Sequence, residues 1–131
     1  MTKLLLDSHV FLWMHGEPER LSMVARELLS EPGTELFLSV VVPWELGIKV
    51  ARKRLALPEE LETFFASRAR AARMTILPIT LRHAVDAAGL PRHHADPFDR
   101  MLIAQARSER LTLVSADAEL ARYDVAFMNA A

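Results

Sequence analysis

The sequence predicts an α/β fold in which a short parallel sheet of about five strands is flanked by helices on both faces. Apolar runs of strand length alternate with segments of helical periodicity along the 131 residues, which is typical of parallel sheets. The runs are apolar almost without interruption, as expected for strands buried on both sides. No repeat, low-complexity tract or linker divides the chain, so we expect a single domain over residues 1–131.

Five apolar runs supply the predicted strands. In chain order they are Lys3–Leu6, Leu36–Val41, Met74–Ile79, Leu111–Val114 and Val125–Met128. The segments between them repeat their apolar residues with the period of a helix. The predicted helices cover residues 9–15, 20–30, 43–55, 59–72, 80–89, 97–108 and 117–122. Because ligands of open parallel sheets bind beyond the carboxyl ends of the strands, a functional site is expected at that edge.

Composition excludes several kinds of protein. The chain has no cysteine, which rules out thiol catalysis and thiolate metal sites and fits a reducing compartment. The longest stretches without a charged residue are nine positions, too short to span a membrane. Three leucines between Lys3 and Asp7 are too few for a secretory signal, so we expect a cytoplasmic protein that does not contact a membrane.

Charge and glycine patterns narrow the choice further. The formal net charge is −1, so the chain as a whole has no positive field for nucleic acid. Residues 49–73 carry seven basic and three acidic side chains, which we interpret first as a solvated helical face. Glycine occurs only at positions 16, 33, 47 and 89, so neither a dinucleotide-binding loop nor a P-loop can be written.

Two acidic residues stand where predicted strands end or helices begin. Asp7 ends the first strand, and either Asp7 or Ser8 could instead cap the following helix. Glu45 falls in the first turn of the helix predicted at 43–55 and borders its apolar face. A pair with Lys49, four residues on, is the alternative interpretation of Glu45.

Asp99 gives the clearest signal. The residues three, four and seven positions after it are Leu102, Ile103 and Ala106, so this carboxylate shares the stripe that faces the core. A buried carboxylate needs a metal, an arginine or dense hydrogen bonding. Asp96 ranks lower, because an aspartate followed by proline is a sound helix start in itself.

Asp117 follows the fourth predicted strand, where either Ser115 or Asp117 could cap a short helix. A parallel sheet would gather Asp7, Glu45, Asp99 and Asp117 at one edge. Clustered carboxylates raise one another's pKa values, and a divalent cation relieves that repulsion. Oxygen ligands favour Mg²⁺ or Mn²⁺, which support hydrolysis of phosphodiesters.

Four ordered motifs resemble those of the PIN-domain ribonucleases, specifically the VapC-type toxins of bacterial toxin–antitoxin modules. The motifs are Leu-Leu-Asp-Ser-His-Val at 5–10, Trp-Glu-Leu-Gly-Ile-Lys at 44–49, His-His-Ala-Asp-Pro-Phe-Asp-Arg at 93–100 and Leu-Val-Ser-Ala-Asp at 113–117. The resemblance spans nearly the whole chain. It implies a PIN-like fold and metal-dependent endonucleolytic cleavage of RNA.

The resemblance also implies roles for single residues. Asp7, Glu45, Asp99 and Asp117 would be the metal-binding acids, and Asp96 an accessory acid. Ser8 and Ser115 stand where the family has a serine or threonine hydroxyl beside the site. The expected partners are an RNA substrate, a second copy of the chain and a cognate antitoxin whose C-terminal segment covers the active site.

Other polar and aromatic residues have more than one interpretation. Lys49 and Arg100 either contact RNA phosphate or pair with an acid. His93 and His94 are assigned mainly to a solvated loop, because hard cations prefer oxygen and adjacent histidines seldom ligate one ion. Trp13 and Trp44 either stack on bases or pack in the core, and their apolar neighbours favour the core.

Three rival functions compete with a nuclease. An aspartyl-phosphate hydrolase needs a second aspartate two residues after Asp7, where this chain has His9. A phospho-receiver domain needs a lysine on a late strand, whereas the lysines here are at positions 3, 49 and 53. A PIN-like RNA-binding or interaction domain without catalysis is disfavoured because all four matching acids are present.

Overall fold

The computed structural model describes residues 2–131 and is built on a parallel sheet of five strands. The strands are β1 (Thr2–Leu6), β2 (Thr34–Ser39), β3 (Thr75–Leu77), β4 (Thr112–Ser115) and β5 (Phe127–Asn129). Their order across the sheet is β3-β2-β1-β4-β5, and every neighbouring pair is parallel. The sheet predicted from the apolar runs is therefore confirmed.

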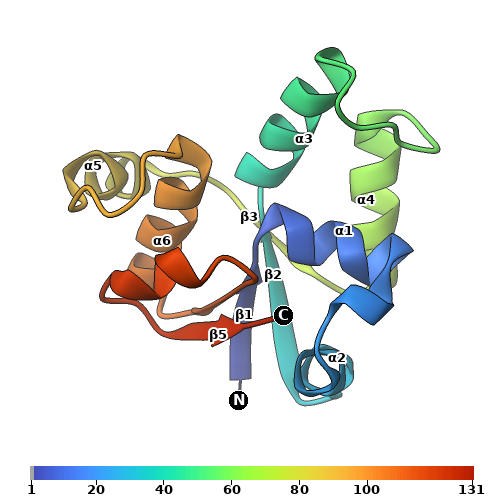
Figure 1. Cartoon of the computed structure of the whole chain (residues 1–131), viewed down its shortest axis with the longest axis horizontal. Helices are drawn as coiled ribbons and strands as arrows, with labels where there is room; N and C mark the ends of the chain where they lie inside the picture. The colour runs from blue at the N-terminus through green and yellow to red at the C-terminus, as the bar shows by residue number, and fades with distance from the viewer. Residues whose placement is uncertain (1) are drawn as a thin grey trace.

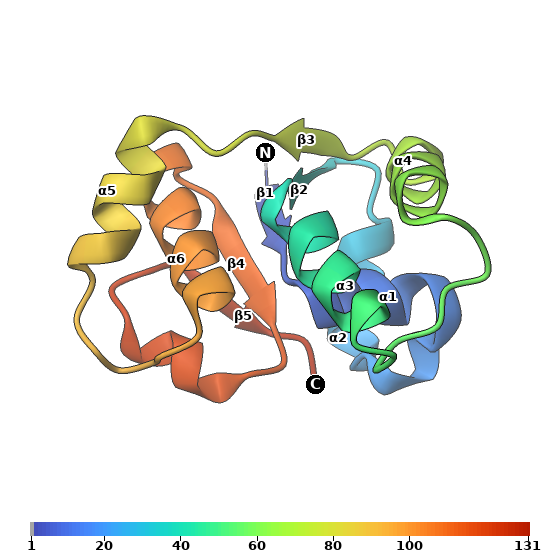
Figure 2. The same ribbon diagram turned by 90° about the horizontal axis from the view of Figure 1, so that it is seen from above.

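Helices connect the strands and cover both faces of the sheet. The α-helices are α1 (Ser8–Gly16), α2 (Met23–Ser30), α3 (Val41–Ala51), α4 (Leu61–Ala71), α5 (Leu81–Gly89) and α6 (Pro97–Glu109). Two 3₁₀ turns are η1 (Pro18–Arg20) and η2 (Ala118–Arg122). Parallel crossovers are right-handed, so the reversal of direction after β3 moves the later helices to the other face. Figures 1 and 2 show α5 and α6 on one side and α1 to α4 on the other.

The strand order reverses between β1 and β4, and this reversal fixes where a site can form. The chain leaves β1 toward one face of the sheet and leaves β4 toward the other. The two connections diverge and leave a crevice at the carboxyl ends of these central strands. Helices α3 and α6, from opposite faces, contact each other there.

The core lies on both sides of the two central strands. Leu5, Leu6, Leu113 and Val114 have no exposed surface, as expected for strands covered on both faces. Phe11 of α1 is buried equally and packs against aromatic rings of α4. Each such fully buried side chain contributes roughly 1.5–3 kcal/mol relative to an exposed one, so the site edge stands on a rigid base.

Several predicted boundaries shift by a few residues. The strand predicted to reach Val41 ends at Ser39, whose hydroxyl accepts the Val41 N–H at 3.0 Å and turns the chain into α3. That helix therefore starts two residues early and ends at Ala51, where Lys53 takes a left-handed conformation with φ 57°. The helix predicted at 20–30 begins only at Met23, because the Ser22 hydroxyl caps it by accepting from Ala25.

None of the helices described in residues 2–131 is long and apolar enough to cross a membrane.

Candidate active site

Asp7 lies at the carboxyl end of β1, buried with 4% of its surface exposed. Its carboxylate accepts the Val10 N–H at 2.8 Å and so caps α1. Burial raises the pKa of Asp7. Hydrogen bonds from Ser115 and from the Val10 N–H oppose that rise, whereas the nearby Glu45 carboxylate adds to it. Asp7 is thus both a helix cap and a buried acid whose charged form is disfavoured by its surroundings.

Glu45 projects from α3 on the same side of the sheet as α1. It lies in the second turn and not the first, because α3 begins at Val41. The Ser8 hydroxyl donates to its Oε1 at 3.0 Å, and the Lys49 Nζ lies 3.2 Å from its Oε2. Glu45 therefore both pairs with Lys49 and lies beside the apolar face of α3, so the two interpretations of this residue hold together. Ser8 and Lys49 together fix the orientation of this buried carboxylate.

Asp99 approaches from the opposite face, on α6. Its neighbours on the stripe, Leu102, Ile103 and Ala106, are buried, so the placement of this acid beside the core is as predicted. Burial, followed by repulsion from Asp96, raises the pKa of Asp99 from 3.8 to about 7. Attraction to His94 lowers it, and the charges of Glu45 and Asp7 raise it further. Acids from β1, α3 and α6 are thus close enough to repel one another.

Asp96 and Asp117 serve as caps at the rim of the crevice. Asp96 accepts from the N–H groups of Phe98 at 2.8 Å and Asp99 at 3.4 Å. Asp117 accepts from Glu119 at 3.0 Å and is the more open acid, with 42% of its side chain exposed. The Ser115 hydroxyl accepts the Asp117 N–H at 3.0 Å and also bonds the Asp7 carboxylate, so it ties the ends of β1 and β4 together.

His94 lies among the acids, although its sequence context predicted mainly a solvated loop. Its Nδ1 accepts the Asp96 N–H at 3.1 Å, so the ring proton is on Nε2. That nitrogen lies 3.1 Å from Asp117 Oδ2 and 3.5 Å from Asp99 Oδ2. One ligand atom from each of His94, Asp99 and Asp117 falls within 4.8 Å of the others. His93 instead packs its ring against that of Tyr123, with the ring centroids 5.0 Å apart.

Arg100 does not reach the acids. Its Nη1 donates to the Pro91 carbonyl at 2.9 Å, and its Nη2 donates to the carbonyls of Ala87 and Leu90 at 2.9 Å each. These bonds fasten the start of α6 to the end of α5. The sequence predicted either a phosphate contact or an ion pair for Arg100. The structure shows instead a guanidinium that donates to backbone carbonyls and so joins α5 to α6.

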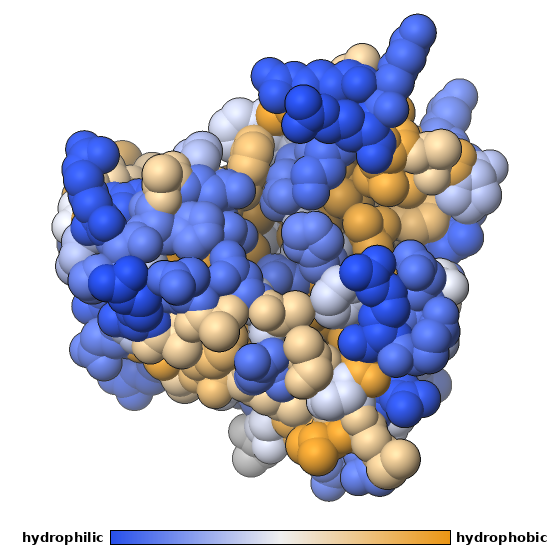
Figure 3. All heavy atoms as spheres, in the orientation of Figure 1, coloured by the Kyte–Doolittle hydropathy of each residue, from blue (hydrophilic) through white to orange (hydrophobic). Residues whose placement is uncertain are grey.

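The surface around the acids is hollowed and polar. Figure 3 shows the hollow where α3 and α6 approach, with hydrophilic side chains around much of it and apolar ones along one wall. A groove of about 450 Å³ continues past Lys49 between α1, the 54–58 loop and α4. Arg20, Arg54 and Arg68 also line this groove, and Glu17 is the acidic side chain among its lining residues. Part of the basic stretch seen in the sequence therefore lines a groove that reaches the acids at Lys49.

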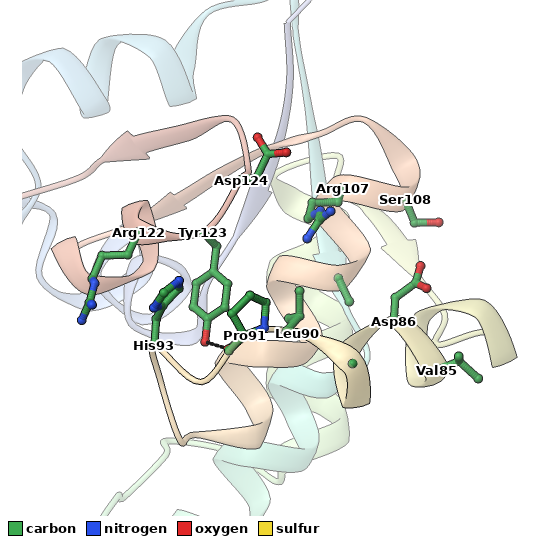
Figure 4. A pocket seen from close by; sticks show the side chains of 12 residues that line it. Val85, Asp86, Leu90, Pro91, His93, Arg107, Ser108, Arg122, Tyr123 and Asp124 are labelled. Carbon is green, nitrogen blue, oxygen red and sulfur yellow. Dashed lines mark hydrogen bonds between the residues drawn. The ribbon is translucent and has the colours of Figure 1, made fainter.

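A larger hollow of about 920 Å³ lies between α5, α6 and η2 (Figure 4). Tyr123 closes one side of it and donates its hydroxyl proton to the Pro91 carbonyl at 2.9 Å. None of the five acids singled out above lines this hollow. The hollow is the larger of the two, but the clustered carboxylates lie outside it, at the crevice between α3 and α6.

The donor set of the crevice fits a hard divalent cation. Carboxylate oxygens predominate, and a cation would relieve the repulsion that adds to burial in raising the pKa of Asp99 to about 7. Ser8, Lys49 and Ser115 already orient the carboxylates of Glu45 and Asp7. A cluster of carboxylates whose orientations are fixed by neighbouring side chains is typical of a metal site.

Comparison with known proteins agrees with the fold and shows the family. The model of the PIN domain matches residues 4–126. Ribonuclease VapC22 of Mycobacterium tuberculosis is 34% identical over 121 residues, which make up 92% of this chain and 91% of that protein.

Solved structures show the same arrangement of strands and helices. VapBC2 from Rickettsia felis, bound to a promoter DNA fragment, matches 99% of this chain and 100% of its own with a TM-score of 0.71 and 15% identity. DNA-bound VapBC from Salmonella typhimurium matches 98% of each chain with a TM-score of 0.67 and 20% identity.

A sheet of this order, with acids at the carboxyl ends of its central strands, defines a nuclease of the PIN class. The chain belongs to the PIN-domain family, as a VapC-type ribonuclease toxin.

Proposed function

We propose that this protein hydrolyses RNA phosphodiester bonds internally, using Mg²⁺ or Mn²⁺ held by Asp7, Glu45, Asp99 and Asp117, with Asp96 as an accessory acid. The observation that carries the proposal is the convergence of acids on one crevice, where burial, and then the charges of neighbouring carboxylates, raise the pKa of Asp99 to about 7. Repulsion between carboxylates destabilises the folded protein, whereas a divalent cation that binds them relieves the repulsion and stabilises the fold.

The side chains around the acids support the chemistry. When bound, such an ion supplies a stronger nucleophile from water and stabilises charge on the leaving oxygen. Ser8 and Lys49 hold the Glu45 carboxylate in one orientation, and Ser115 does the same for Asp7. His94 donates its Nε2 proton toward Asp117 and Asp99 and so holds these two acids together.

Cleavage assays on single-stranded RNA test the proposal. Wild type should cut in Mg²⁺ or Mn²⁺ and stop in excess EDTA. Asp7→Asn keeps the cap on α1, and Asp99→Asn keeps the shape of the side chain, yet each should lower the rate at least about a hundredfold. Glu27→Gln, an exposed change on α2, is the matched control and should cut like wild type. Wild-type turnover by both aspartate variants, or full activity in EDTA, would reject the proposal.

We further propose that a cognate antitoxin covers the crevice, that the chain forms a homodimer, and that it acts in the cytoplasm as one domain over residues 1–131. Similarity to VapBC2 of Rickettsia felis and VapBC of Salmonella typhimurium supports an antitoxin partner. Co-expression with the product of a neighbouring reading frame should give a complex that does not cleave RNA. Separate elution of the two proteins, with cleavage unimpaired, would contradict this.

A further inference from the structure

Trp44 is exposed at the edge of the crevice, against the expectation that it packs in the core. Its exposed fraction is 62%, which is unusual for the largest apolar side chain. Core packing therefore does not account for this residue. Its ring contacts that of Phe98, with centroids 5.0 Å apart and planes at 87°.

The aromatic pair adjoins two of the acids. Trp44 directly precedes Glu45 on α3, and Phe98 directly precedes Asp99 on α6. Because the ring planes are nearly perpendicular, Phe98 can cover at most one face of the indole. Phe98 is itself only half-buried, so the two rings together form an aromatic surface at the rim of the crevice.

We propose that Trp44 stacks on the base of an RNA nucleotide that flanks the scissile phosphate, an inference that rests on the function proposed above. The flat indole face meets the requirement of any nucleobase for a stacking partner. The cation that Glu45 and Asp99 would hold is the proposed binding site of the scissile phosphate. A base next to that phosphate would then be within reach of the indole. On the other side of Glu45, Lys49 supplies positive charge for the sugar–phosphate backbone.

The alternative occupant is another protein, and the surface fits it less well. Protein interfaces need a continuous apolar patch, with aromatic anchors surrounded by other apolar groups. The other large exposed apolar residue of α3 is Val50, six positions away and 38% exposed, on a different side of the helix. An isolated aromatic ring beside carboxylates and a lysine suits a ligand that has both a flat face and charge.

The two tryptophans of the chain allow a direct binding test. In an Asp99→Asn background with Mg²⁺, Trp13→Phe leaves Trp44 as the fluorescent reporter. Its emission should be quenched on titration with a short single-stranded RNA. The comparison variant, Trp44→Phe, leaves Trp13, which is half-buried with the Arg20 guanidinium 4.6 Å from its ring centre. Trp13 lines the groove beside Lys49, so its emission reports RNA in that groove and not RNA stacked at the crevice. The Trp44 reporter should respond more strongly than the Trp13 reporter.

Affinity and base removal then separate stacking from a structural role. Trp44→Leu should weaken RNA binding about tenfold or more, and Trp44→Phe should recover most of the loss. A series of RNAs, each lacking the base at a different position, locates the stacked base. The protein with Trp44 should bind one of these RNAs more weakly than the others, whereas Trp44→Leu should bind all of them alike. In the cleaving protein, Trp44→Leu should raise KM more than it lowers kcat.

Three results would overturn the proposal. The first is an unquenched Trp44 reporter or an unchanged RNA affinity of Trp44→Leu, even when wild type cleaves RNA. The second is an abasic profile that Trp44→Leu leaves intact. The third is conversion of a dimer to monomers by Trp44→Leu in sedimentation, which would assign the indole to an interface between copies. Failure of wild type to cleave RNA rejects the proposed function through a separate assay.

Discussion

At the scale of single residues, most of the acids serve both the fold and the site. Asp7, Asp96 and Asp117 each accept backbone N–H groups at the start of a helical segment. Asp99 is different, because it caps nothing and its burial beside Leu102 and Ile103 is unfavourable. The stability effect of removing its charge therefore distinguishes a site residue from a cap.

We expect Asp99→Asn to leave the melting temperature of the metal-free protein unchanged or to raise it. The folded-state pKa of Asp99 is about 7, above the ordinary 3.8, so the folded protein binds this proton more tightly than the unfolded chain does. Wild type should consequently lose stability as pH rises from about 4 to 7, by at most about 4 kcal/mol. The variant should lack this loss.

Thermal melts across that pH range, with and without Mg²⁺, measure both effects. Mg²⁺ should stabilise wild type more than Asp99→Asn. Ser22→Ala, which removes the uncharged cap of α2, is the control for a pure cap and should lose about 1 kcal/mol at every pH. A lower melting temperature for metal-free Asp99→Asn, with equal metal shifts for the two proteins, would show that Asp99 is structural.

At the scale of elements, the position of Asp99 depends on how α6 is anchored. Arg100 holds the first turn of α6 to the carbonyls of Ala87, Leu90 and Pro91, at the end of α5 and the start of the following loop. The same loop carries His94 to the acids. One guanidinium thus positions both α6 and the 91–96 segment against the crevice.

Arg100→Met should destabilise the protein by about 1–3 kcal/mol, because several carbonyls lose a charged donor. Urea denaturation measures the change. Arg107→Met, at an exposed position on the same helix, should stay within about 0.5 kcal/mol of wild type. Unchanged stability of Arg100→Met, together with clearly weaker RNA binding, would restore the phosphate contact considered from the sequence.

At the scale of the whole molecule, charge distribution matters more than the net charge of −1. Lys49, Arg20, Arg54 and Arg68 line the groove that leads away from the acids. Lys49, Arg68 and Arg20 pair with Glu45, Glu59 and Glu17, which leaves Arg54 as the exposed cation of this groove with the greatest freedom to meet phosphate. A nearly neutral protein can therefore present a locally basic track.

RNA binding should weaken as NaCl rises, despite the small net charge. Arg54→Gln should reduce the magnitude of the slope of log affinity against log salt by about 0.7, the value for one contact to single-stranded RNA. Arg26→Gln, an exposed change on α2, is the matched control and should leave the slope as in wild type. Equal slopes for all three proteins would place the RNA elsewhere.

The sequence by itself determined the sheet and the acids at its edge. Continuous apolar runs specify strands that are buried on both faces, and parallel strands bring their carboxyl ends to one edge whatever their order. This places Asp7 and Asp117 together. The stripe of Leu102, Ile103 and Ala106 likewise orients Asp99, because helical periodicity is a local property of the chain.

Tertiary structure decided the rest, because those features depend on residues far apart in the chain. His94 joins the site through Asp117, Trp44 meets Phe98 across two helices, and Arg100 finds the carbonyls that end α5. Local pattern cannot distinguish an exposed tryptophan on a helix from a buried one when the covering element is distant in sequence. The acids were predictable from local placement, whereas their partners were fixed by how α3, α6 and the 91–96 segment pack together.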